Sequence, residues 1–507
     1  MKMITSRTAV AVVAGAACLL SPAAWAQTPS DFTSQLRPRF WVGDDETRYS
    51  LAERMDHYGV PGVAIAIIQD GDLVYAEGFG VLQAGGDEAV NAHTVFSAGS
   101  VSKIATSALT LRLHELEQLD INAPVSTQLV SWQLPESEFD NERVTLRTIL
   151  SHTAGFNVHG FPDFQPGAAQ PNVYDTLNGS APALTEALTL TFEPGSTYRY
   201  SGGGFTLAQL IIADQTDTTF EAAAETHLFA PLGMSRSSFA NPLPEDHGNI
   251  ARAHDRQGEP TALPRGYESM PEMAASGLWT SSHDLGLLVA GLINDYRGEG
   301  DYLGRETAID MMSRVARSQH GLGPRIEHAG NQYFFHHAGA NNSYQSWMEG
   351  HLVTGDGLVV LTNGANGNAL HMEIRNAVAD AMGWQINAPY RLPELEIPQA
   401  TLASMTGRFA PNDRVPLDMR QQMVSGIYAW DLEVTLVDGQ LQVGRVGGDF
   451  ALPLIPVTPT RFVIDGLAMR EGVAELEFHR DATRQVNGMS FHIANASTHY
   501  ERMNAAD

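Results

Sequence analysis

FSAGSVSKIATS, residues 96–107, contains the single lysine that this 507-residue chain has beyond Lys2. Ser100 and Lys103 stand three positions apart where the sequence predicts the start of a helix, so both side chains would lie on one face and within reach of each other. Gly99 permits a tight turn before the serine. The free backbone N–H groups of a helix start could also stabilise an oxyanion that forms on a bound carbonyl group.

The lysine suggests a role for this stretch, because the chain uses arginine at every other basic position after Lys2. Arginine stays protonated in proteins, whereas a partly desolvated lysine can take a proton from a serine. The exception therefore favours a lysine at position 103 that must titrate or fit as a compact charge. The alternative is an N-capping serine followed by a surface lysine, because S-x-x-K is common by chance. Further motifs have to distinguish the two.

The overall composition is that of a globular protein, with 43% hydrophobic and 18% charged residues. The length allows two or three domains with a sizeable core. The net charge is −27, and no basic run follows the first few residues. Nucleic acids and anionic membrane surfaces need a positively charged partner, so both are excluded as expected partners.

The N-terminus has the features of a secretory signal peptide. Lys2 and Arg7 precede an apolar stretch that is too short for a transmembrane span, and an A-W-A pattern ends at Ala26. We therefore expect residues 1–26 to be removed and the product to be exported to the periplasm, with no membrane insertion after cleavage. The only cysteine, Cys18, lies in this segment, so the mature chain would have no disulfide, no thiol nucleophile and no cysteine-bound metal.

The middle of the chain reads as a mixture of strands and helices. An apolar, β-branched run, a D-G turn and a second run predict a β-hairpin over residues 62–80. Residues 156–182 are rich in Gly, Pro and Asn, which predicts a long ordered loop. Apolar periodicity predicts helices at 104–119, 205–212, 219–227, 282–293 and 372–382, and adjacent strands at 344–349 and 357–362.

The C-terminal part has a different pattern. Three prolines mark a linker at residues 386–400, and repeated short alternating runs follow it. These runs predict a small antiparallel β-barrel or sandwich over residues 401–503. The expected organisation is an α+β fold: a large domain over residues 32–385, the linker, and a small all-β domain.

Four further stretches carry a family resemblance: LRTILSHTAGF (146–156), FEPGSTYRYSGGGFTLAQL (192–210), EMAASGLWTSSHDLGLL (272–288) and FFHHAGANNSYQS (334–346). Together with the S-x-x-K stretch, and in this order, they resemble the serine β-lactamase and penicillin-binding protein superfamily. The branch that is most similar contains class C β-lactamases, D-aminopeptidases, D-alanyl-D-alanine carboxypeptidases and related esterases. The resemblance implies a β-lactamase-like domain, in which an antiparallel sheet has flanking helices and a helical subdomain.

The resemblance also implies roles for three residues of the site. Ser100 would be the nucleophile that is acylated, and Lys103 would share its proton. Tyr200 takes the place of the tyrosine in the family's Y-x-N motif, where it would act as a general base or proton relay with a phenol pKa lowered by Lys103. Whether Lys103 or Tyr200 is the base for acylation stays open at this point.

The opposite wall of the expected cleft is a strand. His337 and Gly339 match the first and third positions of the family's K-T-G or H-x-G motif. The backbone N–H groups of Ser100 and Ala340 would form the oxyanion hole. This arrangement of nucleophile, adjacent base and orienting groups agrees with what nucleophilic catalysis requires.

Two positions depart from the family pattern. Gly202 stands where Y-x-N has asparagine, so an amide that would hold the substrate is missing. His337 replaces a lysine, so a fixed cation becomes a side chain that is mostly neutral near pH 7. Both departures favour the aminopeptidase, amidase and esterase relatives over a dedicated β-lactamase or carboxypeptidase.

The numerous histidines do not form a recognisable metal motif. The pairs His152/His159 and His336/His337 have no H-E-x-x-H and no carboxylate at a helical ligand spacing, so structural roles are expected for them. His152 lies in a segment that resembles the family's S-H-T-x-G and would support the cleft wall. No G-x-S-x-G elbow occurs. We therefore expect neither a metal nor another cofactor.

The sequence predicts an exported serine hydrolase that cleaves an amide or ester bond through a Ser100 acyl-enzyme. A peptidase or amidase acting on short peptides, including those with D-residues, is the first expectation. An esterase or weak β-lactamase is the alternative within the enzymes, and a non-catalytic ligand-binding or sensor protein is the alternative of another class. The expected partner is a small-molecule or short-peptide substrate, and the sequence leaves the oligomeric state open.

Overall fold

The structure is a computed structural model that describes residues 29–164, 167–267, 269–316, 318–329, 332–412, 430–448, 451–465, 473–493 and 496–503. The predicted signal peptide lies outside the described residues. Within the described ranges, no helix has the length and apolar character needed to cross a membrane.

The centre of the large domain is a six-stranded antiparallel sheet with the strand order β3-β2-β9-β8-β7-β6. The predicted hairpin is confirmed as β2 and β3, which pair from Gly62↔Gly80 to Gln69↔Asp72. The central strand β2 is apolar rather than alternating because both of its faces are buried. The strands are β2 (Gly62–Gln69), β3 (Asp72–Gly80), β6 (Arg325–Ala329), β7 (Gln332–Ala340), β8 (Gln345–His351) and β9 (Gly357–Thr362).

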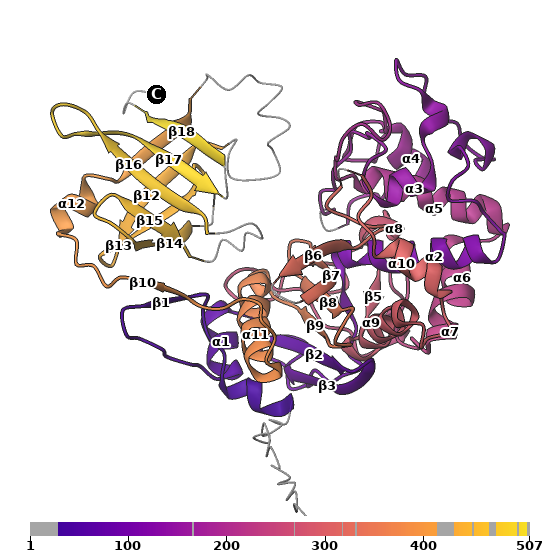
Figure 1. Ribbon diagram of the computed structural model, residues 1–507, viewed down its shortest axis with the longest axis horizontal. Coiled ribbons are helices and arrows are strands. Elements are labelled where there is room, and N and C mark those ends of the chain that lie inside the picture. The colour runs from indigo at the N-terminus through magenta and orange to yellow at the C-terminus, as the bar shows by residue number, and fades with distance from the viewer. Residues whose placement is uncertain are drawn as a thin grey trace, which may run out of the picture.

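Helices cover both faces of this sheet (Figure 1). The helices α1 (Leu51–Tyr58) and α11 (Gly367–Met382), with the 3-10 helix η1 (Pro29–Ser34), pack on one face. On the other face lies α9 (Ser282–Arg297), which is part of the main core together with α2 (Ser102–Glu115). Helix α2 is buried on nearly all sides over its first three turns, which makes it the central helix of the domain.

A helical region extends from α2 on the side away from the C-terminal domain (Figure 1). The predicted loop at 156–182 contains the short helix α4 (Val173–Asn178). Two short strands, β4 (Phe96–Ser97) and β5 (Trp279–Thr280), pair beside α2. The remaining helices here are α3 (Leu146–Leu150), α5 (Gly202–Thr216), α6 (Phe220–Ala224), the π-helix η5 (Glu225–Phe229), α7 (Ala230–Leu232), α8 (Met273–Ser276) and α10 (Arg305–Met311), with 3-10 turns η2 (Gly99–Val101), η3 (Val125–Thr127), η4 (Asn141–Arg143) and η6 (Glu245–His247).

The C-terminal domain is a closed antiparallel barrel of eight strands, which decides between the two predicted alternatives. Inward-facing residues such as Leu432, Phe462 and Phe491 form its own core. The strands are β11 (Gly407–Pro411), β12 (Leu432–Val437), β13 (Gln440–Arg445), β14 (Ala451–Pro456), β15 (Arg461–Ile464), β16 (Glu475–Arg480), β17 (Val486–Ile493) and β18 (Ala496–Arg502).

A two-stranded parallel ribbon lies between the two domains. It pairs β1 (Phe40–Val42) with β10 (Tyr390–Leu392), so the stretch predicted as a linker contains a strand and then leads into α12 (Gln399–Ala403). Phe40 and Leu392 form a small apolar cluster with Val463 of the barrel strand β15. The barrel therefore packs on this ribbon. In the left half of Figure 1, the barrel lies above β1 and β10.

Candidate active site

Ser100 lies in the 3-10 turn η2, between β4 and α2, with the end of β7 directly beside it. Gly99 has a φ of +50°, and a Cβ at this position would lie 2.7 Å from the backbone nitrogen of Ala340. A Cβ at Gly339 would lie 1.9 Å from the backbone oxygen of Ala98. These two glycines let the strand and the turn approach closely, which brings the two expected oxyanion donors, Ser100 and Ala340, together.

Hydrogen bonds fix the turn that carries Ser100. The Ser102 hydroxyl donates to the backbone oxygen of Gly99 at 2.6 Å and accepts the Leu278 N–H at 2.9 Å. The Ser346 hydroxyl on β8 donates to the backbone oxygen of Ala98 at 2.8 Å. The nucleophile candidate is therefore held between α2, β5 and the sheet without depending on a mobile loop.

Lys103 is a buried residue and not the surface lysine of the alternative interpretation. The residue is only 2% exposed, and its Nζ lies 3.3 Å from Ser100 Oγ. The same Nζ donates a hydrogen bond to the backbone oxygen of Ala275 at 2.8 Å. Burial lowers the pKa of Lys103 to about 7. At neutral pH a large share of the amine is therefore unprotonated and able to accept a proton from Ser100.

Tyr200 lies on the other side of Ser100, to which it is hydrogen-bonded. Burial raises the pKa of its phenol to about 12, and the hydrogen bond with Ser100 only partly opposes this. The expectation that Lys103 lowers this pKa is wrong, because desolvation of the phenolate dominates. The lysine Nζ sits over the ring, 5.0 Å from its centroid. Near pH 7 Tyr200 is a neutral phenol that can donate or relay a proton.

His152 holds the Tyr200 segment in place. Its backbone oxygen accepts the Arg199 N–H at 2.9 Å, and its Nδ1 accepts the Ser201 N–H at 3.1 Å. The imidazole stacks on the Tyr200 ring with 4.2 Å between centroids. His152 adopts a φ of +58°, a left-handed conformation that is rare for residues other than glycine. These contacts agree with the predicted supporting role in the cleft wall.

Two further histidines lie close to Tyr200. His337 donates from Nδ1 to the backbone oxygen of Ala338 at 2.6 Å, and His320 donates from Nδ1 to that of Gly323 at 2.7 Å. Burial holds the pKa of both imidazoles well below the usual range, so both are neutral near pH 7. The sequence reasoning missed His320, because no motif surrounds it.

His336 belongs to a different environment. Its ring stacks on Trp347 at 4.8 Å between centroids, and neighbouring residues of a strand point to opposite faces of the sheet. Burial lowers the pKa of His336 to about 3. The adjacent pair His336/His337 therefore does not act together, as expected for structural histidines.

Arg325 brings a permanent positive charge to the region, which the sequence reasoning also missed. It lies at the start of β6, the edge strand next to β7, and its Nη1 donates to Gln319 Oε1 at 3.0 Å. Burial is the main cause of the lowered pKa of His337, and the charge of Arg325 is one of the further causes. The same charge opposes the rise in the pKa of Tyr200. The cation that His337 does not supply is thus present on the neighbouring strand.

The space that the family's asparagine side chain would need at position 202 is filled. A Cβ at Gly202 would lie 2.9 Å from Cε2 of Phe161 and 3.2 Å from the backbone oxygen of His159. The Gly202 N–H donates to that same oxygen at 2.9 Å. The predicted loop thus passes directly over the start of α5, and its aromatic ring replaces the amide.

Two carboxyl groups lie in segments that flank these residues. Asp163 accepts the N–H of Asn342, two residues beyond Ala340, at 2.7 Å. Glu272 is 2% exposed and precedes α8, which provides the oxygen that binds Lys103; its Oε2 has no hydrogen-bond partner among the described residues. Burial raises the pKa of Glu272 to about 7, and the Asp163 charge adds to the effect. No motif marks either residue in the sequence.

The comparison with known families agrees with this geometry. The beta-lactamase family profile matches residues 50–382. The chain belongs to the beta-lactamase family. The match covers the whole sheet, the helical region and every residue discussed for the site. This beta-lactamase family member therefore has a β-lactamase-like fold, and the resemblance that the motifs indicated is confirmed.

Individual relatives of this beta-lactamase family member are distant. Penicillin-binding protein 4 of Amycolatopsis lactamdurans is 28% identical over 208 residues, 41% of this chain and 51% of that protein. The D-aminopeptidase of Gluconobacter oxydans is 24% identical over 180 residues, 36% of this chain and 33% of that protein. The chain thus spans about half or less of the length of these curated relatives. The octameric penicillin-binding protein homologue from Pyrococcus abyssi shares the fold, with a TM-score of 0.57 at 20% identity over 89% of this chain and 98% of that one.

Proposed function

We propose that this protein is an exported serine hydrolase that cleaves an amide or ester bond in short peptides, including those with D-residues, through an acyl-enzyme on Ser100. The observation that carries the proposal is the position of Lys103: its Nζ lies 3.3 Å from Ser100 Oγ in a buried site that lowers its pKa to about 7. A structural lysine would gain nothing from such a place, whereas a general base gains the right pKa.

In the proposed acylation step, Lys103 Nζ takes the proton of Ser100 as Oγ forms a bond to the substrate carbonyl carbon. The resulting oxyanion accepts hydrogen bonds from the N–H groups of Ser100 and Ala340. The tetrahedral intermediate then breaks its bond to the leaving group. That group receives a proton from Tyr200, which Lys103 replenishes, and the acyl group remains on Ser100.

In the deacylation step, water attacks the ester carbonyl and loses its proton to the same pair of residues. Ser100 leaves with a proton, and the acid product is released. With a phenol pKa of about 12, Tyr200 serves as a proton relay rather than as the first base. The neutral histidines His152 and His320 keep its ring in position without adding charge.

The charges around the site support a peptide as the substrate. Arg325 offers a permanent cation for a carboxylate, and the carboxyl groups of the half-buried Asp163 and the buried Glu272 offer partners for an amino group. A short peptide carries both groups, whereas a simple ester carries neither. The relationship to a D-aminopeptidase adds D-residues to the substrates that we propose. Export rests on the N-terminal signal pattern of residues 1–26.

The nucleophile is tested by covalent labelling. We expect a fluorophosphonate to modify Ser100 in the wild type, as located by peptide mass spectrometry, and Ser100→Ala to lose both labelling and turnover. The variant should fold, because the loss of one hydroxyl at a helix start costs at most about 1 kcal/mol. Retained turnover in Ser100→Ala would overturn the proposal. Labelling of the wild type without turnover on any substrate would instead indicate a sensor.

The substrate class is tested with a panel of p-nitroanilides of L- and D-amino acids and short peptides, p-nitrophenyl esters and nitrocefin. We expect peptide amides and activated esters to be hydrolysed faster than the cephalosporin, because Phe161 occupies the place of the asparagine that would hold a β-lactam amide. Hydrolysis of the esters but not of the amides would favour the esterase alternative. Nitrocefin turnover equal to that of the best ester would select the β-lactamase alternative.

A further inference from the structure

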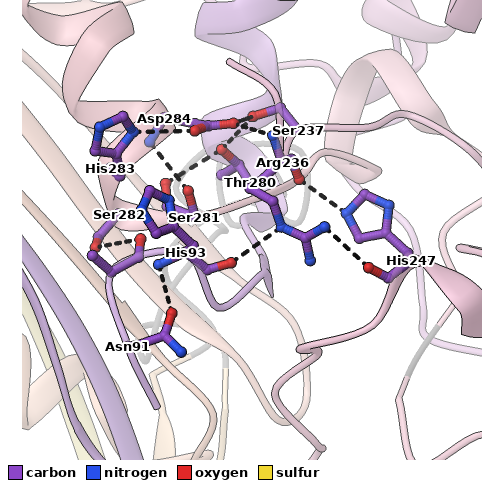
Figure 2. Close-up of polar contacts among 11 residues, drawn as sticks. Asn91, His93, Arg236, Ser237, His247, Thr280, Ser281, Ser282, His283 and Asp284 are labelled. Atoms are coloured by element: carbon purple, nitrogen blue, oxygen red, sulfur yellow. Dashed lines mark hydrogen bonds and ion pairs between the residues drawn. The ribbon is translucent and has the colours of Figure 1, made fainter. Parts of the chain in front are cut away.

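A cluster of three metal-ligating side chains lies outside the candidate active site. His93 is in the turn before β4, and His283 and Asp284 are in the first turn of α9. One nitrogen of each histidine and one oxygen of the aspartate all lie within 4.8 Å of one another. Figure 2 shows the His283 ring beside Asp284, with His93 on the adjacent turn.

Backbone hydrogen bonds hold the two histidines side by side. The His93 N–H donates to Asn91 Oδ1 at 2.9 Å, which fixes the turn (Figure 2). The His283 N–H donates to the backbone oxygen of Ala92 at 3.2 Å, which ties this turn to α9. The two imidazole centroids are consequently 4.8 Å apart. The pair is part of the local fold and not a chance meeting of long side chains.

Asp284 is fully buried, and its environment leaves one oxygen directed at the histidines. Its Oδ2 accepts the N–H of Arg236 at 2.6 Å and the hydroxyl of Ser237 at 3.0 Å. Its Oδ1 lies 3.4 Å from His283 Nδ1. Within the described part of the chain, no lysine or arginine forms an ion pair with this carboxylate. Burying a carboxylate is costly unless a positive partner compensates for it.

The guanidinium of Arg236, whose backbone N–H binds Asp284, is engaged elsewhere. It donates to the backbone oxygens of His93 at 3.3 Å and His247 at 3.0 Å (Figure 2), and to that of Gly248 at 2.6 Å. It therefore orders the turn that carries His93 but does not neutralise Asp284. Its charge and the positive end of α9 both oppose a bound cation. Binding must consequently depend on the imidazoles and not on the carboxylate alone.

We propose that His93, His283 and Asp284 bind a divalent transition-metal ion, with Zn²⁺ as the first candidate. Two imidazole nitrogens and one carboxylate oxygen suit zinc, whereas calcium and magnesium prefer oxygen ligands throughout. Ligand distances of about 2 Å require the side chains to close in slightly, which the exposed His93 can do. A water molecule would complete four-coordination.

The site would act as a structural cross-link. It joins the turn before β4 to the start of α9, at the end of β4 opposite to the turn that carries Ser100. A ligand that binds only the folded chain stabilises it in proportion to the logarithm of its concentration above Kd. We therefore expect zinc to raise the thermal stability of the protein and to leave its turnover unchanged.

The test uses the mature protein without a histidine tag, treated with EDTA and then titrated with ZnCl₂ in a calorimeter and in thermal unfolding. We expect about one zinc per chain and a Tm that rises with zinc concentration. His93→Ala should weaken zinc binding by more than about tenfold and remove the rise in Tm. The matched control is His328→Ala, another exposed histidine, on β6, which should behave as the wild type.

Two further measurements keep the proposal open to refutation. Metal-free His93→Ala should hydrolyse an activated ester at the wild-type rate, which shows that it folds. Zinc could also bind the histidines around Tyr200, so His320→Ala is titrated in parallel. The absence of a zinc effect on the wild type, an unchanged effect in His93→Ala, or a loss of binding in His320→Ala alone would each overturn the proposed site.

Discussion

Lys103 shows at the level of one residue why the chain departs from its use of arginine. The position is buried, the Nζ is shared between Ser100 Oγ and the backbone oxygen of Ala275, and the pKa is lowered to about 7. An arginine there would stay protonated, and its planar guanidinium is larger than an ammonium. We expect Lys103→Arg to lose nearly as much ester turnover as Ser100→Ala.

The measurement compares the initial rates of wild type, Lys103→Arg and Ser100→Ala on one activated ester, with circular dichroism as the control for folding. Arginine and lysine have similar helix propensities, so α2 should still form. A folded Lys103→Arg protein with wild-type turnover would show that the lysine does not share a proton with Ser100.

The lowered pKa of Lys103 also sets the sign of a pH effect. Below about pH 7 the amine is protonated and cannot act as a base, so kcat/KM should rise as the pH increases through about 7. Tyr200, with a pKa of about 12, adds no second transition below pH 9 or so. A profile between about pH 5 and 9 with a non-titrating substrate checks this. A rate that is flat, or that falls, across pH 7 would contradict the role of Lys103.

The same shift affects stability in a defined direction. The amine has a pKa of 10.5 as a free side chain and about 7 in the fold, so the unfolded chain binds more protons between these values. The contribution of Lys103 to the free energy of unfolding should therefore rise with pH across this window. This rise with pH reflects the stability cost of burying Lys103, the residue that we propose as the general base.

At the level of elements, the sequence predicted what local patterns determine. The hairpin at 62–80, the helices α5, α9 and α11 and the alternating strands of the barrel all follow from apolar periodicity and turn residues. Ser100, Lys103 and Tyr200 could be proposed from the sequence because motifs mark them. Arg325 was not, because its proximity to Tyr200 depends on which strand forms the edge of the sheet.

The loop over α5 could not be predicted for a similar reason. Gly202 was visible as a departure from Y-x-N, but only the fold shows that Phe161 occupies the vacated space. A ring contributed from a distant position leaves no periodic signal near residue 202. Local patterns thus locate the elements and the motifs, whereas the contacts that adjust specificity depend on how loops cross them.

This contact gives a prediction about the loop and α5 together. Gly202→Asn alone places its Cβ 2.9 Å from the ring of Phe161, so we expect lower turnover on all substrates, because the loop must shift. The double variant Phe161→Ala/Gly202→Asn removes the ring and restores the family's Y-x-N pattern. It should recover turnover of an activated ester, and its ratio of nitrocefin to ester turnover should exceed that of the wild type.

The control for this pair is Phe161→Ala alone, which opens the same space without adding an amide. If it raises nitrocefin turnover as much as the double variant, the ring acts only as a steric barrier. If neither variant changes the ratio of cephalosporin to ester turnover, the explanation of the departure at Gly202 is wrong. Thermal unfolding of all three variants separates lost packing from altered specificity.

For the whole molecule, the decisive feature is the ribbon that joins the two domains. β1 lies near the start of the large domain and β10 lies in the stretch that follows it. Their pairing forms a ribbon against which the barrel packs. Parallel pairing between segments so distant in the chain has no local signature. The sequence therefore predicted both the barrel and the stretch before it, but not that this stretch packs against the barrel.

The apolar contact between the ribbon and the barrel can be disrupted at one residue. Val463 is 1% exposed and packs on Phe40 and Leu392, whereas its neighbours Phe462 and Ile464 belong to the core inside the barrel. Val463→Asp would place an unpaired carboxylate in this apolar contact, which costs several kcal/mol if the contact persists. We expect the barrel to stay folded and to leave the ribbon, which exposes the chain between β10 and α12.

A protease that cleaves after glutamate reports this release, because Glu394 and Glu396 lie between β10 and α12. Val463→Asp should be cut there faster than the wild type, while its turnover of an activated ester stays the same, since none of the contacts described around Ser100 involves the barrel. The matched control is Val437→Asp, a barrel valine that is 43% exposed and should change neither rate. An unchanged cleavage rate would show that the apolar cluster does not hold the barrel. Lost turnover in Val463→Asp, with the barrel still folded, would show that packing of the barrel on the ribbon contributes to the active site.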